Sequence, residues 1–159
     1  MESSEPPKDA GQPAPTRAEI RLSAAYATAR VLAEASTLAE ATPRILQAIC
    51  DSLGWIHGAI WRLDEASGEL RCVETWHPPS AEVPEFDAIS RRSTFAPGIG
   101  LPGRVWAKAE PAWIPDVTQD GNFPRAPVAA REGLHAAFGF PIVIGNRVLG
   151  VLEFFSREI

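Results

Sequence analysis

The chain has 159 residues, of which 45% are hydrophobic, and its 20 acidic and 15 basic side chains give a net charge of −5. This length suits one domain with a sizeable core, and the scattered basic residues argue against nucleic-acid binding. No apolar run reaches the ~20 residues of a membrane span, and an N-terminus without an apolar signal core predicts a cytoplasmic protein with no membrane insertion.

The N-terminal part predicts a tail and a helix. Residues 1–15 are rich in proline, serine and acidic residues, so a disordered tail is expected. Thr16 and Glu19 have capping-box spacing, and the helix that they open is expected to run to about Ala35. Its small apolar residues share one face, which suits close packing against a sheet or a second copy: Ile20, Ala24, Ala27 and Val31.

A second helix and two hairpins follow. The helix is expected to have Thr42 as its cap, Pro43 in its first turn and Gly54 at its end. "HGAIWRLD" and "ELRCVETW" flank the turn "EASG", which predicts a hairpin. "HAAFGFPIVI" and "RVLGVLEFF", joined by Gly145 and Asn146, predict another. Strands joined by short turns predict an antiparallel sheet in an α+β fold.

The segments between the hairpins are less regular. "PPSAEVPEFDAISRRS" reads as a loop with one short helix, "EPAWIPD" as a short extended piece, and "VTQDGNFPRAPVAAREG" as a long irregular connection, which is often a binding loop. Pro141 interrupts the last hairpin, because proline lacks a ladder donor, and is therefore placed at a sheet edge or a bulge.

"GIGLPG", residues 98–103, has the spacing of a dinucleotide loop. Such a loop needs a buried strand before it and a parallel crossover around it. The preceding "RRSTFAP" is polar and ends in proline, so we expect neither a strand before this loop nor phosphate binding by it.

Four stretches together resemble a GAF domain of the kind found in bacterial sensor histidine kinases: "LGWIHGAIWRLDEASGELRCVETW", "GIGLPGRVWAKAEPAWIPDV", "DGNFPR" and "REGLHAAFGFPIVIGNRVLGVLEFFS". The likeness covers roughly Leu22 to Ser156. It implies a GAF-like, PAS-related antiparallel sheet of about six strands, with terminal helices on one face and a pocket under loops and short helices on the other. Residues 16–159 would then form a single GAF-like domain that ends at the start of a signalling helix.

The implied pocket lies under a roof formed by residues 95–135. We expect large apolar residues and two titratable groups to bind the ligand there: Trp76, Phe95, Leu101, Val105, Trp113, Asp116, Phe123, His135 and Phe138. Core packing is the alternative for the tryptophans, as are capping of loop amides for Asp116 and a hydrogen-bonded strand end for His135. So few charges favour a small, largely neutral or aromatic ligand.

The cofactors of GAF relatives do not fit the residues present. The pocket helices have no cysteine for bilin attachment, the cyclic-nucleotide signature is not found, and no dinucleotide is expected. The three histidines lack metal-site spacing, and His57 and His77 are expected to be solvated. The ligand stays unknown.

The resemblance implies a sensory module that binds a small molecule and acts through a homodimer of terminal helices on an output domain, such as a histidine kinase of a two-component system. A ligand-free dimerisation scaffold is the alternative. A third class, free methionine sulfoxide reductase, needs an accessible thiolate and a resolving thiol. Cys50 and Cys72 lie in apolar segments and read as buried free thiols, so we expect no enzymatic activity.

Overall fold

A six-stranded antiparallel sheet forms the centre of the protein, in the order β3-β2-β1-β6-β5-β4. The computed structural model describes residues 16–34 and 38–159, with side chains for residues 16–28 and 40–159, so the predicted tail over residues 1–15 lies outside the described residues. The strands are β1 (His57–Asp64), β2 (Glu69–Trp76), β3 (Thr94–Phe95), β4 (Ala112–Ile114), β5 (Ala137–Ile144) and β6 (Arg147–Phe155).

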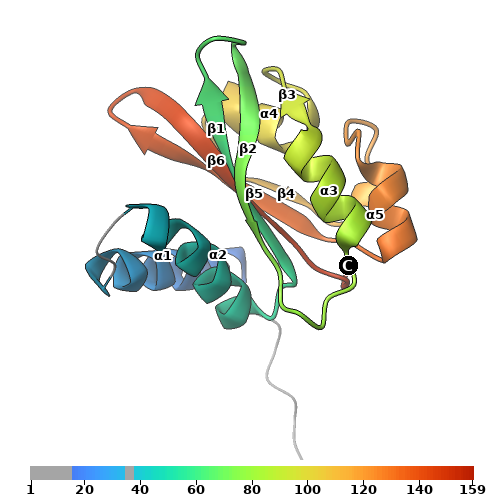
Figure 1. Cartoon of the computed structure of the whole chain (residues 1–159), viewed down its shortest axis with the longest axis horizontal. Helices are drawn as coiled ribbons and strands as arrows, with labels where there is room; N and C mark the ends of the chain where they lie inside the picture. Colours follow the sequence, from blue (N-terminus) through green and yellow to red (C-terminus); the bar gives the residue numbers. More distant parts are fainter. Residues whose placement is uncertain (1–15, 35–37) are drawn as a thin grey trace, which may run out of the picture.

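Helices cover both faces of this sheet. One face carries α1 (Arg17–Glu34) and α2 (Leu38–Leu53), and the other carries α3 (Pro84–Arg92), α4 (Gly100–Lys108) and α5 (Ala126–Glu132) (Figure 1). We call these the helix face and the roof face. The α+β architecture with a six-stranded antiparallel sheet is confirmed. Within the described residues, none of the helices is long and apolar enough to span a bilayer.

The predicted capping box opens α1. The Thr16 N–H donates to Glu19 Oε2 at 2.6 Å, and the Glu19 N–H donates to Thr16 Oγ1 at 3.2 Å. Three residues of the small face of α1, Ile20, Ala24 and Ala27, are buried in the core of the helix face, where α1 packs against α2, while the Val31 side chain lies outside the described residues. The sequence suggested that this face could pack closely against a second copy. Because its described residues are already buried within one chain, a dimer through α1 would have to use another face of the helix.

Pro43 lies inside α2, so the prediction that it stands in the first turn is wrong. The helix begins five residues earlier, at Leu38, and forgoes one backbone bond at the proline. It ends as predicted, at Gly54 with φ of +68°, while the Trp55 N–H donates to the Cys50 carbonyl at 3.0 Å.

Alternation along the strands divides the core in two. In β6, Val151 and Phe155 pack on the roof face, whereas Leu152 and Phe154 pack on the helix face. Both hairpins form at the predicted residues. Pro141 lies beyond the end of the short β4, next to a register shift after Ile142, which agrees with its predicted place at an edge or bulge.

Two expectations for the segment between the hairpins are wrong. A strand does precede residues 98–103, because β3 pairs antiparallel with β2 at the sheet edge. The connection after β4 is also less irregular than expected, since it holds a 3-10 helix (Val117–Gln119) and α5. Local caps explain these short helices: Asp116 accepts from the Thr118 N–H, and Gly133 adopts φ of +75° at the end of α5.

Candidate functional site

An ion pair lies at the centre of the roof face. The guanidinium of Arg125 donates from Nη1 to Glu153 Oε1 at 2.8 Å and from Nη2 to Glu153 Oε2 at 2.9 Å. Arg125 is 1% exposed and Glu153 is 0% exposed. Nη1 also donates to Ser90 Oγ of α3 at 2.9 Å, so the pair ties β6 to α3 and to the start of α5.

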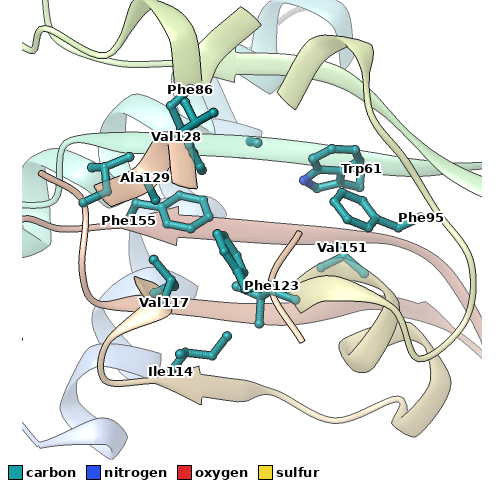
Figure 2. Packing of buried hydrophobic residues seen from close by; sticks show 14 of the residues in the cluster. Trp61, Phe86, Phe95, Ile114, Val117, Phe123, Val128, Ala129, Val151 and Phe155 are labelled. Carbon is teal, nitrogen blue, oxygen red and sulfur yellow. The ribbon is translucent and has the colours of Figure 1, made fainter. Parts of the chain in front are cut away.

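Aromatic rings enclose this pair. The Cζ atom of Arg125 lies 4.9–5.4 Å from five ring centroids, those of Trp61, Phe86, Phe95, Phe123 and Phe155. Figure 2 shows these rings gathered between the sheet and the roof helices. A guanidinium over aromatic faces is stabilised by their quadrupoles. The protein's own cation and rings therefore occupy the centre of the roof face.

The two loops that frame the roof hold each other in place. The Gly100 N–H donates to Asn122 Oδ1 at 3.0 Å, and Asn122 Nδ2 donates to the Gly98 carbonyl at 2.9 Å. Arg104 pairs with both carboxylate oxygens of Asp120. The Gly98 N–H donates to the Gly103 carbonyl at 2.8 Å. Amides that a phosphate loop would offer to its ligand are thus bonded within the protein.

His57 anchors α3 to the sheet. Its Nε2 lies 3.1 Å from Asp87 Oδ1, and its ring is fully buried, so the expectation that it is solvated is wrong. Burial lowers the pKa of His57, since the charged imidazolium loses its hydration. Burial alone would raise the pKa of Asp87, but hydrogen bonds from His57, Thr75 and Arg91 outweigh it and hold that pKa well below its usual range.

The sheet separates the residues predicted to share one pocket. Four of them pack in the core of the roof face: Phe95, Leu101, Val105 and Phe123. Three others belong to the core of the helix face: Trp76, Trp113 and Phe138. A single pocket formed by all seven is therefore wrong, because Trp76, Trp113 and Phe138 project from their strands to the face opposite the roof.

The remaining two predicted site residues meet at the end of the sheet. His135 Nδ1 lies 3.0 Å from Asp116 Oδ1, and that oxygen also accepts from the N–H and hydroxyl of Thr118. These bonds lower the pKa of Asp116, with Thr118 and then His135 as the largest causes. The alternatives of a capping aspartate and a hydrogen-bonded strand-end histidine are confirmed.

A groove of about 620 Å³ opens on the helix face, between α1 and the edge formed by β4 and β5. Its floor holds Trp113, Phe138 and Phe140, and α1 supplies the opposite wall through residues that include Ile20, Ala24 and Thr28. Two residues predicted for the ligand site, Trp113 and Phe138, thus line a groove, although on the face opposite to the expected one. Whether any of the nine binds a ligand stays a prediction.

The two cysteines lie on different sides of the sheet. Cys50 is buried in the core of the helix face, and Cys72 packs against the core of the roof face. Both are free thiols. Burial, helped by nearby Asp51 for Cys50 and Glu153 for Cys72, raises both pKa values to about 12. Neither side chain is therefore set up as a thiolate at neutral pH.

A family model described as a GAF domain matches residues 35–159. The chain belongs to the GAF family. Solved structures with the same fold include the GAF domain of a phosphoenolpyruvate-protein phosphotransferase from Coxiella burnetii, which is 19% identical with a TM-score of 0.68 over 86% of this chain and 79% of that one. Comparison with curated protein sequences found no match.

Two further GAF-like structures are similar. A free methionine-R-sulfoxide reductase from Neisseria meningitidis, in complex with its substrate, is 18% identical with a TM-score of 0.65 over 89% of this chain and 75% of that one. A putative GAF sensor protein from Burkholderia vietnamiensis is 17% identical, with a TM-score of 0.62 over 91% and 82%. At such identities the likeness shows the fold.

Sequence reasoning missed the two most buried charges of this GAF domain. Glu153 interrupts the apolar run "VLEFF", and it shares strand parity with Val151 and Phe155, which marks it as inward-facing. A buried carboxylate requires a partner, so the inward position of Glu153 could have predicted a buried ion pair. The sequence did not identify Arg125 as the partner, because only the fold brings it to β6.

Replacing Arg125 with methionine should leave the Glu153 carboxylate buried among aromatic rings without a cationic partner. We expect R125M to lower the free energy of unfolding by about 3–5 kcal/mol, measured by urea denaturation. The double variant R125M/E153L removes the stranded charge and should recover most of that loss. The control R131M breaks a pair with Glu85 in which both side chains are 59% exposed, and should cost at most about 1 kcal/mol. Equal losses for R125M and R131M would contradict a special role for the buried pair.

Stability should fall as the pH is lowered from 7.5 to 5.5. His57 is held neutral in the folded state, whereas the unfolded chain takes up a proton below its ordinary pKa of about 6.5, so acid favours unfolding. The free energy of unfolding should fall by up to about 1.4 kcal/mol per pH unit at the acidic end of this range. The lowered pKa of Asp87 affects the pH dependence of stability only near or below the ordinary pKa of 3.8, which lies outside this pH range. Denaturation of H57Q should give a flatter profile, and a profile parallel to the wild type would refute the assignment to His57.

Proposed function

We propose that this GAF domain is a regulatory module that binds a small molecule in the groove between α1 and the β4–β5 edge, and passes the event to a homodimer through α1. An output domain such as a histidine kinase would receive the signal. The observation that carries this proposal is the groove itself: its floor belongs to the sheet, and its wall is the peripheral helix α1 (Figure 1). A ligand that bridges them would bias the position of α1.

The occupied centre of the roof face supports the choice of the groove. Arg125 and its five aromatic neighbours occupy the centre of that face. A ligand there would have to displace a bidentate ion pair at a cost of several kcal/mol. The groove needs no such displacement, and its volume and apolar lining suit a small organic molecule.

The outward face of α1 supports the dimer. Leu22 and Tyr26, one turn apart, are each 72% exposed. Large apolar side chains at this spacing on a peripheral helix form a patch that a second copy could cover. Because neither Leu22 nor Tyr26 lines the groove, ligand and partner would contact the same helix through different residues.

Two alternatives are weighed against this proposal. A scaffold that binds no ligand is favoured by the ion pair and rings that occupy the centre of the roof face. Reduction of free methionine sulfoxide is the activity named for the Neisseria structure. For this chain it is disfavoured by the placement of the buried Cys50 and the half-buried Cys72 on opposite sides of the sheet, and by the pKa of about 12 to which burial raises both thiols.

A panel of small organic molecules should contain compounds that raise the melting temperature of the wild type. By linkage, a ligand at 100 times its Kd adds about 2.7 kcal/mol, which corresponds to roughly 5–10 °C for a domain of this size. A25W should abolish the shift, because it places an indole on a residue that lines the groove. S23W, which carries the same ring on an exposed part of α1 outside the groove, should keep it. A wild type that no compound stabilises would favour the scaffold.

Sedimentation of the wild type should show a dimer at micromolar concentration. L22E/Y26E places two charges on the outward patch and should shift the protein to a monomer with an unchanged helical circular-dichroism spectrum. S23E, also exposed on α1, serves as the control for added charge. A wild type that stays monomeric at high micromolar concentration would contradict dimerisation through α1.

A further inference from the structure

We propose that the groove takes a small aromatic carboxylate, with its ring on the aromatic floor and its carboxylate on Arg17 and Arg21. This inference rests on the proposed function, because it names the ligand class of the same groove. The sequence predicted a neutral or aromatic ligand next to Asp116 and His135. The groove contains neither of these, and it has two arginines instead.

The floor presents a series of nearly parallel rings. Trp113 and Phe138 are stacked, with centroids 5.8 Å apart and planes 15° apart. Phe138 and Phe140 continue the series at 6.1 Å and 18°. Phe138 is only 5% exposed, so the half-buried Trp113 and Phe140 present most of the aromatic surface to the groove. A planar aromatic body can add offset-stacked or edge-to-face contacts to these two rings that a branched aliphatic one cannot. The adjoining Ala112 and Pro111 add short side chains that leave this surface open.

The charge of the lining is entirely positive. Arg17 and Arg21 belong to the lining, which has no acidic residue. Within the described part of the chain, neither guanidinium has an acidic partner within 4.0 Å. The chain as a whole carries a charge of −5, so this positive pair is a local feature rather than part of a basic surface.

The spacing of the two arginines favours an anion between them. Arg17 and Arg21 are four residues apart on α1, where like charges repel each other and an intervening anion removes the repulsion. The Cζ atom of Arg17 lies over the Trp113 ring, 5.4 Å from its centroid, which places one cation at the Trp113 end of the aromatic floor. A guanidinium offers paired N–H donors that match a carboxylate. A neutral ligand would leave this match unused, and a cationic one would be repelled.

Three naphthyl compounds with the same ring test the charge of the ligand by calorimetry on the full chain: 2-naphthoate, 2-naphthamide and 2-naphthylmethylammonium. We expect 2-naphthoate to bind about tenfold more tightly than 2-naphthamide, which corresponds to about 1.4 kcal/mol, and the ammonium to bind most weakly. R17Q/R21Q should remove the preference for the carboxylate while leaving the affinity for 2-naphthamide unchanged. R62Q/R71Q removes the same charge from the β1–β2 hairpin and should behave as the wild type.

The outcomes separate the ligand class from the function. If 2-naphthamide or the ammonium binds as tightly as 2-naphthoate, and A25W blocks it, the groove is a ligand site and the anionic class is wrong. The class is also wrong if R17Q/R21Q keeps the carboxylate preference. If no naphthyl compound binds but other members of the panel do so in the groove, only the aromatic carboxylate is refuted. If nothing binds there, the proposed function fails with it.

Discussion

The buried pair of Arg125 and Glu153 is the constraint around which the roof face is organised. A carboxylate in the middle of β6 has lost its hydration and needs hydrogen-bond donors that reach it from within the protein. Arg125 supplies two of them, and a third bond from its guanidinium reaches Ser90 of α3. The segment after β4 must therefore fold back over the sheet, and α3 must lie close enough for Ser90 to meet the same cation. A packing that failed to bring these groups together would leave a charge buried without a partner.

The same constraint explains why the two loops around the roof are interlocked. Asn122 and Asp120 precede Arg125 by only a few residues, and they bind the backbone of Gly98 and Gly100 and the side chain of Arg104. The segment that delivers the buried cation thus also holds the start of α4. Adding a Cβ at Gly103 would bring it within 2.3 Å of the Ala96 carbonyl oxygen, so this contact between turn and helix requires glycine.

The buried ion pair of the roof and the open groove of the helix face give the two sides of the sheet different properties. The roof is held by ion pairs and by close aromatic packing, which leave few alternative arrangements. On the helix face, α1 packs mainly on α2, and the groove lies between α1 and the β4–β5 edge. A conformational change is easier for an element held by fewer contacts. A signal that begins in the groove would therefore be expressed in the position of α1 rather than in the sheet or the roof.

Local patterns in the sequence determined the hairpins, the capping box of α1 and the end of α2, because alternation, turn residues and capping side chains act within a few positions. They did not determine that Pro43 would lie inside a helix, since the residues before it decide where that helix begins. The site depended on tertiary structure for a different reason. Trp113 and Phe138 project from β4 and β5 to the helix face, whereas Phe123 lies on the roof face, and only the packing of the segment after β4 over the sheet decides this. Arg125 and Glu153 are 28 residues apart, so only the completed fold brings this cation to its carboxylate.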